Sequence, residues 1–248
     1  MDLPLYLAMT AYEIARANPC PTHCAYMACH FSSYAAGLSG FPRSLPEGAI
    51  LILNDRIPVL GHDPALICKQ LHSCAEQHHV SAILLDLQRP NEVQTQIIVQ
   101  KILDTAACPV AVSHLYAKDL PCPVFVPVPP LDCSLESHLA AWDGREIWLE
   151  AAIGEQILTV TEKGCKSSNL SSYFTKNVSF DEPKLHCQYG IEIYPDKIEF
   201  SLHRTYKELL SLLEEAKKCG ITKAVGLYQQ LHSFLFDDDC TAENSVIK

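Results

Sequence analysis

The stretch SAILLDLQRP, residues 81 to 90, is an aliphatic run that ends in an acid, an amide and a guanidinium. Runs that are apolar over their whole length are typical of strands buried on both faces of a parallel sheet. Because side chains alternate along a strand, Leu84, Asp86 and Gln88 share one face. The stretch therefore predicts a buried strand that carries polar side chains at its carboxyl end.

Seven similar runs occur elsewhere, at residues 3 to 9, 24 to 31, 48 to 55, 108 to 116, 122 to 129, 146 to 153 and 223 to 231. Three of the intervals between runs have helical periodicity. Residues 62 to 79 begin with Asp63 as a helix cap, and residues 205 to 220 begin with a capping-box pattern. Eight strands with helical crossovers predict an α/β fold of the (β/α)8 TIM-type barrel class.

The chain length of 248 residues is within the range of a single β/α barrel. We expect one domain over residues 1 to 235 and a flexible tail over residues 236 to 248. Residues 154 to 204 alternate between apolar and polar side chains, as half-exposed strands do. This segment predicts a small β-rich insertion before the last helix.

The formal net charge is −10, and the 19 Lys and Arg residues do not cluster. This pattern argues against binding to nucleic acid or to an anionic membrane surface. No apolar run approaches the roughly 20 residues that span a bilayer. The first residues lack the basic region of an export signal, and the twelve cysteines are scattered. We therefore expect a soluble, cytoplasmic protein with reduced cysteines.

Cofactor and metal motifs are missing from the sequence. It has only ten glycines and neither a P-loop nor a GxGxxG pattern, so we expect no nucleotide cofactor. The stretch CPTHCAYMACH, residues 20 to 30, is rich in Cys and His, but its spacings differ from those of zinc sites. We expect no metal ion, and the oligomeric state remains open.

Functional groups of β/α barrels lie at the carboxyl ends of the strands. The candidate catalytic residues are Asp86, Asp55 and Glu150, and the candidate ligand-binding residues are Gln88, Arg89, Asn54, His114, Tyr116 and Tyr228. A carboxylate beside an amide can orient a ligand, and a guanidinium can clamp an anion or pair with an acid. The alternative for a strand-end acid such as Asp86 is a structural role as a cap or an ion pair.

Either Asp55 or Glu150 could face Asp86 across the mouth of the barrel. Two carboxyl groups about 5 Å apart suit retaining glycoside hydrolysis, and a separation of roughly 6.5 to 9.5 Å suits the inverting reaction. The sequence does not contain this distance, so both reactions stay open.

The stretch VSAILLDLQRP also resembles the fourth-strand motif Asp-x-x-Asp-x-Asp-x-Glu of the chitinase-type, family 18 glycoside hydrolases. Laid onto this chain, the four motif positions fall at Ser81, Leu84, Asp86 and Gln88, so only the third acid is kept. The runs at 24 to 31 and 48 to 55 are similar to the second and third strands of that family. Tyr228 stands where the family usually has a tryptophan, and residues 154 to 204 fall where it often has an insertion.

The resemblance implies a glycan-related function with a degenerate site. In the family, the motif glutamate protonates the leaving oxygen while the preceding aspartate orients an acetamido group of the substrate. A glutamine has no proton to give near neutral pH, so Gln88 implies a pseudo-enzyme or an enzyme with relocated acids. We expect the barrel mouth to bind, or to hydrolyse, a glycan or polar small molecule.

Two other functions stay open. One is a non-catalytic interaction or scaffold protein, which would have a plugged mouth and an exposed apolar patch elsewhere. The other is an unrelated barrel enzyme that uses Asp55, Asp86 and Glu150.

Overall fold

The computed structural model describes residues 3 to 59, 61 to 89, 92 to 169 and 180 to 236. The chain forms two compact units. The first contains the residues up to Pro127 together with Gly144–Glu150 and Ile221–Gln229, and the second contains Val128–Asp143, Ala151–Gly220 and the residues from Gln230 on. In the described part of the chain, no helix combines the length and the apolar character that crossing a membrane requires.

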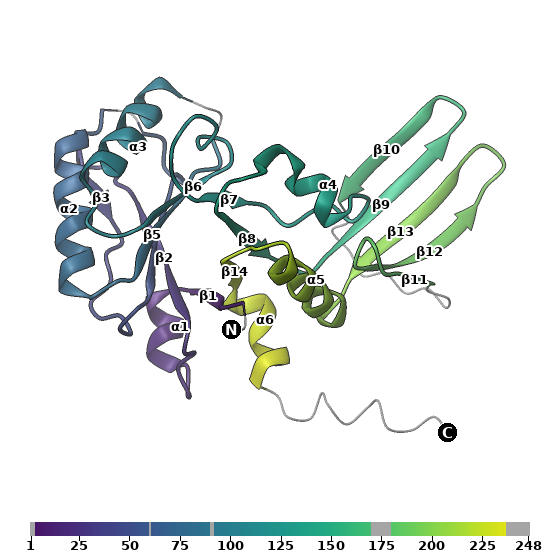
Figure 1. The fold of residues 1–248 in the computed structure, drawn as a ribbon, viewed down its shortest axis with the longest axis horizontal. Coiled ribbons are helices and arrows are strands. Elements are labelled where there is room, and N and C mark those ends of the chain that lie inside the picture. The colour runs from purple at the N-terminus through teal and green to yellow at the C-terminus, as the bar shows by residue number, and fades with distance from the viewer. Residues whose placement is uncertain (1–2, 60, 90–91, 170–179, 237–248) are drawn as a thin grey trace. The chain divides into compact units, whose positions relative to one another are not determined.

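A closed barrel of eight parallel strands forms the first unit (Figure 1). The strands are β1 (Leu5–Met9), β2 (Cys24–Phe31), β4 (Ile50–Asn54), β5 (Ala82–Asp86), β6 (Val110–Ser113), β7 (Val124–Val126), β8 (Ile147–Ala151) and β14 (Lys223–Leu227). They pair in the order β1-β14-β8-β7-β6-β5-β4-β2, and the pairing of β1 with β2 closes the ring. A two-residue strand, β3 (Leu38–Ser39), adds to β2 in the antiparallel sense. The predicted barrel is confirmed.

The interior of the barrel is filled by every second residue of the strands. These residues form one buried cluster to which all eight parallel strands contribute: Tyr6, Ala8, Ala25, Ile50, Ile52, Ala82, Leu84, Ala111, Phe125, Trp148 and Val225, with Met27 packed against it. Such layers of inward side chains are how a barrel of this size is filled. Since Leu84 lies inside, the next inward position of β5 is Asp86.

Three helices follow strands of the first unit: α1 (Ala11–Arg16), α2 (Pro64–Gln77) and α3 (Val93–Thr105). Helix α2 begins as its sequence predicts, because the Asp63 side chain accepts a hydrogen bond from the Ala65 N–H at 2.9 Å and Pro64 is the first helical residue. Helices α2 and α3 lie beside each other on the outside of the barrel strands (Figure 1).

The second unit is built around a five-stranded antiparallel sheet. Its strands are β9 (Gly154–Thr161), β10 (Gly164–Asn169), β11 (Phe180–Glu182), β12 (Cys187–Ile193) and β13 (Ile198–Arg204), in the order β10-β9-β13-β12-β11. The unit also contains α4 (Leu135–Leu139), the 3-10 turn η1 (Ala140–Trp142) and α5 (Tyr206–Lys218). Leu131 forms a small buried cluster with Cys187 of β12 and Leu202 of β13. The predicted β-rich insertion is confirmed.

Helix α5 has the predicted capping box at Thr205 and Glu208. The Glu208 carboxylate accepts hydrogen bonds from the Thr205 N–H, at 3.1 Å, and from the Thr205 hydroxyl. The buried face consists of Leu209, Leu212, Leu213 and Ala216, together with Glu208. The i, i+4 pair Ser211 and Glu215 lies on the flank of this face, with Ser211 exposed and Glu215 half-exposed.

The end of the barrel differs from the prediction. The run at 223 to 231 predicts one strand, but β14 ends at Leu227 and α6 (Tyr228–Phe236) begins directly after it. Tyr228, Leu231 and Leu235 recur at helical spacing, and Leu231 is fully buried, which favours a helix over a longer strand. Of the predicted tail, residues 237 to 248 lie outside the described residues.

Candidate functional site

A polar layer lies above the barrel core at the carboxyl ends of the strands. Asn54, Asp86, Ser113 and Glu150 each come two residues after a core residue of the same strand, namely Ile52, Leu84, Ala111 and Trp148. By strand alternation all four are inward positions. Asn54 and Asp86 are also direct partners in the register of β4 and β5. The barrel thus gathers two predicted carboxylates and one predicted amide at its mouth.

Asp86 is half-buried and is paired with Gln88. The Gln88 side-chain amide donates a hydrogen bond to Oδ1 of Asp86. Burial raises the pKa of Asp86 above its usual value, the hydrogen bond from Gln88 lowers that pKa, and the nearby charge of Asp55 raises it further. The net rise makes Asp86 a carboxyl that takes up a proton more readily than an exposed aspartate.

Asp55 fastens the loop after β5 to the end of β4. It is buried, with 4% of its surface exposed. Its Oδ1 accepts the Gln88 N–H at 2.9 Å, and its Oδ2 accepts the Arg89 N–H at 2.8 Å. Both carboxylate oxygens therefore bond backbone groups, so this carboxylate positions Gln88. A catalytic role for Asp55 stays a prediction.

Arg89 and Tyr116 hold the same loop from the other side. The Arg89 guanidinium donates to the Asp55 carbonyl at 2.8 Å and to the Arg56 carbonyl at 3.0 Å. The Tyr116 hydroxyl, on a residue 6% exposed, donates to the Arg89 carbonyl at 3.3 Å and accepts the Glu92 N–H at 3.3 Å. These bonds show how both predicted ligand-binding side chains shape the loop that carries Gln88.

Asn54 and Ser113 stabilise the irregular ends of neighbouring strands. The Asn54 amide donates to the carbonyls of Met27 and Cys29, both at 3.0 Å, across the register shift of β2. The fully buried Ser113 hydroxyl donates to the Leu87 carbonyl at 2.7 Å. Ser113 is an addition to the predicted site, and its alternation with Ala111 is the signal in the sequence that identifies it.

The remaining predicted residues lie at different places on the barrel. Glu150 is half-buried in β8, which is separated from β5 by β6 and β7. His114 directly follows β6, and its N–H donates to the Phe125 carbonyl at 2.9 Å. Since β6 ends at Ser113, His114 lies in the turn that follows the strand. Tyr228 is half-buried at the first residue of α6 rather than in a strand.

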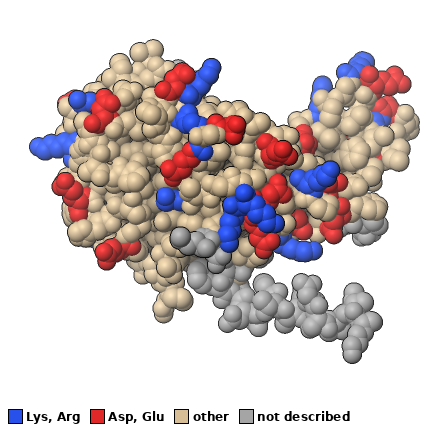
Figure 2. Space-filling model, viewed as in Figure 1, with Lys and Arg blue, Asp and Glu red and all other residues tan. Residues whose placement is uncertain are grey.

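Charged side chains of both signs are interspersed on the face shown in Figure 2, and no continuous basic surface appears there. Such a distribution offers no extended positive surface to a phosphate backbone on this face. The absence of nucleic-acid binding stays a prediction.

Comparison with known proteins identifies the fold. No protein-family model matches the chain, and no curated protein matches it. Among solved structures, it is similar to the spore cortex-lytic enzyme SleL of Bacillus cereus, with a TM-score of 0.54 and 8% identity over 91% of this chain and 70% of that one.

The chain is also similar in structure to two chitinases. The chitinase from Chromobacterium violaceum ATCC 12472 matches with a TM-score of 0.51 and 7% identity over 90% of this chain and 93% of that one. Chitinase ChiW from Paenibacillus sp. str. FPU-7 matches with a TM-score of 0.57 and 8% identity over 92% of this chain and 41% of that one. At such identities the likeness concerns the fold alone. The chain therefore has a TIM-type barrel fold like that of these chitinases and of SleL.

Proposed function

We propose that the mouth of the barrel binds a saccharide, or a similarly polar small molecule, without hydrolysing it. The observation that carries this proposal is the hydrogen bond from the Gln88 amide to Asp86. An amide can orient a carboxylate, but it cannot supply the proton that a leaving glycosidic oxygen needs. The pair is therefore suited to recognition of a ligand.

The mouth offers groups that suit a hydroxyl-rich ligand. Within the described chain, Oδ2 of Asp86 accepts no protein hydrogen bond, so it is available to a ligand donor. The exposed Gln88 side chain has an amide oxygen that can accept a second hydrogen bond. Since Asp55 fixes the Gln88 backbone, both groups are held before a ligand arrives.

The fold comparisons decide which ligand to test first. Two of the similar solved structures are named chitinases and one is named a spore cortex-lytic enzyme. We therefore choose N-acetylglucosamine oligomers as the first ligands.

Isothermal titration calorimetry of these oligomers tests binding. Asp86→Ala should weaken the affinity about 10- to 100-fold, because it removes a hydrogen bond to a charged group. Glu47→Ala is the matched control, since Glu47 is an exposed carboxylate before the amino end of β4. If the wild-type protein does not bind, or if both variants bind equally well, the proposed site is wrong, and a scaffold role then gains support.

Hydrolysis by relocated acids is the second candidate, and the raised pKa of Asp86 is the observation that favours it. Asp86 could then act as the acid, with Glu150, at the next inward position of β8, as the second carboxylate. Turnover of fluorogenic N-acetylglucosamine oligomers separates the two functions. A wild-type protein that binds without turnover, together with a Gln88→Glu variant that gains turnover, supports the binding function. Wild-type turnover that both Asp86→Ala and Glu150→Gln abolish supports the hydrolase.

A further inference from the structure

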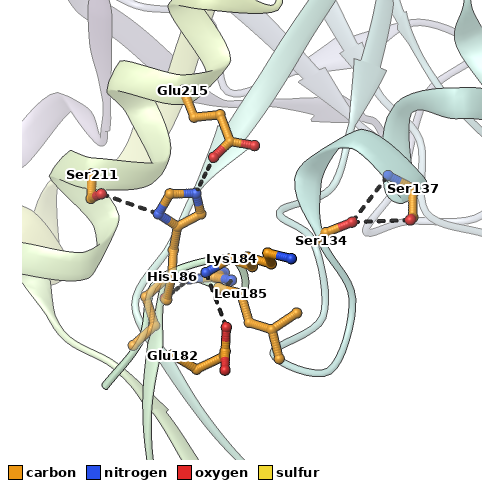
Figure 3. Close-up of polar contacts among 9 residues, drawn as sticks. Ser134, Ser137, Glu182, Lys184, Leu185, His186, Ser211 and Glu215 are labelled. Atoms are coloured by element: carbon orange, nitrogen blue, oxygen red, sulfur yellow. Dashed lines mark hydrogen bonds and ion pairs between the residues drawn. The ribbon is translucent and has the colours of Figure 1, made fainter.

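A serine, a histidine and a glutamate are joined by hydrogen bonds in the second unit (Figure 3). His186 lies on the turn between β11 and β12, and Ser211 and Glu215 lie one helical turn apart on α5. The Ser211 Oγ is 3.2 Å from Nδ1 of His186, and the Glu215 Oε2 is 2.7 Å from Nε2. The imidazole thus stands between a hydroxyl and a carboxylate.

The partners determine which ring nitrogen carries the proton when His186 is neutral. A carboxylate only accepts hydrogen bonds, so the bond to Glu215 places the proton on Nε2. The lone pair of Nδ1 then faces Ser211 and accepts the hydrogen bond from its hydroxyl. The ring nitrogens have the reverse of their roles in the serine proteases, but the relay of hydroxyl, imidazole and carboxylate is the same.

The histidine is held in place from several sides. Only 5% of its side chain is exposed, and its backbone φ of 48° lies in the left-handed region, which is uncommon for residues other than glycine. The buried Arg204 side chain donates to the carbonyls of His186 at 3.1 Å and Leu185 at 3.3 Å. Backbone strain that the surroundings impose is found most often at functional sites.

The hydroxyl of this relay is accessible while its base is shielded. Ser211 is exposed, whereas the ring that bonds it is buried. Lys184, two residues before His186 on the same turn, is exposed, and its side chain extends away from Ser211 (Figure 3). An exposed serine whose hydroxyl bonds an imidazole that a carboxylate orients is suited to nucleophilic attack on an acyl carbon.

We propose that Ser211, His186 and Glu215 form a second site that hydrolyses small acyl esters, with Ser211 as the nucleophile. The Ser211 Oγ attacks the ester carbonyl carbon while His186 Nδ1 takes the hydroxyl proton. The bond between the acyl carbon and the ester alkoxy oxygen then breaks. His186 gives the proton to that oxygen, so the alcohol leaves and the acyl group stays on Ser211. Water then attacks the acyl-serine with His186 as base, which releases the carboxylic acid and restores Ser211. Glu215 orients the imidazole and stabilises its charged form.

A fluorophosphonate probe, which forms a covalent bond with activated serines, tests the site in the full chain. Labelling should map to Ser211 by mass spectrometry. His186→Gln should slow labelling and p-nitrophenyl acetate turnover on the order of 100-fold, as expected for loss of a general base. Glu215→Gln should slow both reactions less, because it removes only the orienting charge.

Ser137→Ala is the matched control. Ser137 is an exposed serine of the same unit that bonds Ser134 and is not hydrogen-bonded to a histidine (Figure 3). This variant should keep full labelling, and Ser211→Ala should lose it at an unchanged melting temperature. Absence of labelling in the folded wild-type protein would overturn the proposal and leave the three residues as a clasp between the turn and α5. Labelling that persists in Ser211→Ala would overturn it as well.

Discussion

Asp55 provides the sharpest test of how the barrel mouth is held together. Its two carboxylate oxygens accept the backbone N–H groups of Gln88 and Arg89, and the side chain is 4% exposed. Hydrogen bonds to a charged group contribute about 1.5 to 3 kcal/mol each. Asp55→Ala removes both bonds and should lower the free energy of unfolding by about 3 kcal/mol or more, whereas Asp55→Asn keeps one acceptor and should lose about 1.5 kcal/mol.

The assay is urea unfolding followed by tryptophan fluorescence. Trp148 is fully buried in the barrel interior, and Trp142 is the second of the two tryptophans, so the measurement is made in a Trp142→Phe background. Trp148 then reports on the barrel unit. Asp104→Asn is the control, because Asp104 is an exposed acid that accepts one side-chain hydrogen bond, and a surface change of this kind stays within about 0.5 kcal/mol.

Two results would refute the reasoning about Asp55. Values for both Asp55 variants within about 0.5 kcal/mol of the wild type would mean that the backbone bonds do not stabilise the loop. Unchanged stability combined with loss of oligomer binding would instead place the Asp55 carboxylate in the ligand site itself.

Three further predictions concern charge, burial and backbone geometry. Because the pKa of Asp86 is raised in the folded state, its protonated form stabilises the fold below the unfolded value near 3.9, and this contribution is lost as pH rises through the higher folded value. In urea unfolding, the wild type should therefore lose stability relative to Asp86→Asn as pH rises above about 4, and a constant difference contradicts this. Arg204→Met should cost at least about 3 kcal/mol in thermal unfolding, since it leaves three backbone carbonyls without their donor, and a cost under about 1 kcal/mol argues against this role. A Cβ at Gly40 would lie 2.0 Å from the Ala28 carbonyl oxygen at a φ of +75°, whereas at Gly48, with a φ of +77°, it would meet nothing within 4 Å. Gly40→Ala should therefore lower the free energy of unfolding by at least about 2 kcal/mol more than Gly48→Ala, and equal losses would contradict the close approach.

Local patterns predict most of the barrel because each of them depends on neighbouring residues. The aliphatic run at 81 to 87 contains β5, and the predicted face that Leu84 shares with Asp86 is the one that points into the barrel. The caps at Asp63 and Thr205 form as their sequences predict, since a cap needs only residues within one helical turn. The run at 223 to 231 is the exception, since it predicts one strand where the structure has β14 followed by α6. Apolar residues there fit both strand alternation and helical spacing, and burial of Leu231 favours the helix.

The candidate site is predicted only in part. Strand order places Asn54, Asp86 and Glu150 at the barrel mouth, which follows from the fold class. The roles of Asp55 and Arg89 do not follow from sequence, because the groups that they bond are more than 30 residues away along the chain. The sequence also contains no sign that His186 meets Ser211, 25 residues later, on a different element.

The sequence by itself determines the eight barrel strands, the capped helices, the β-rich insertion and the positions of the polar strand ends, because hydrophobic periodicity and capping act over a few residues. Only the tertiary structure decides what those polar groups do. Closure of the barrel places the Asp55 carboxylate against the backbone of Gln88 and Arg89, and the packing of α5 brings its serine and glutamate to His186. Hydrogen bonds act only over about 3 Å, so their partners are set by which segments come together in space.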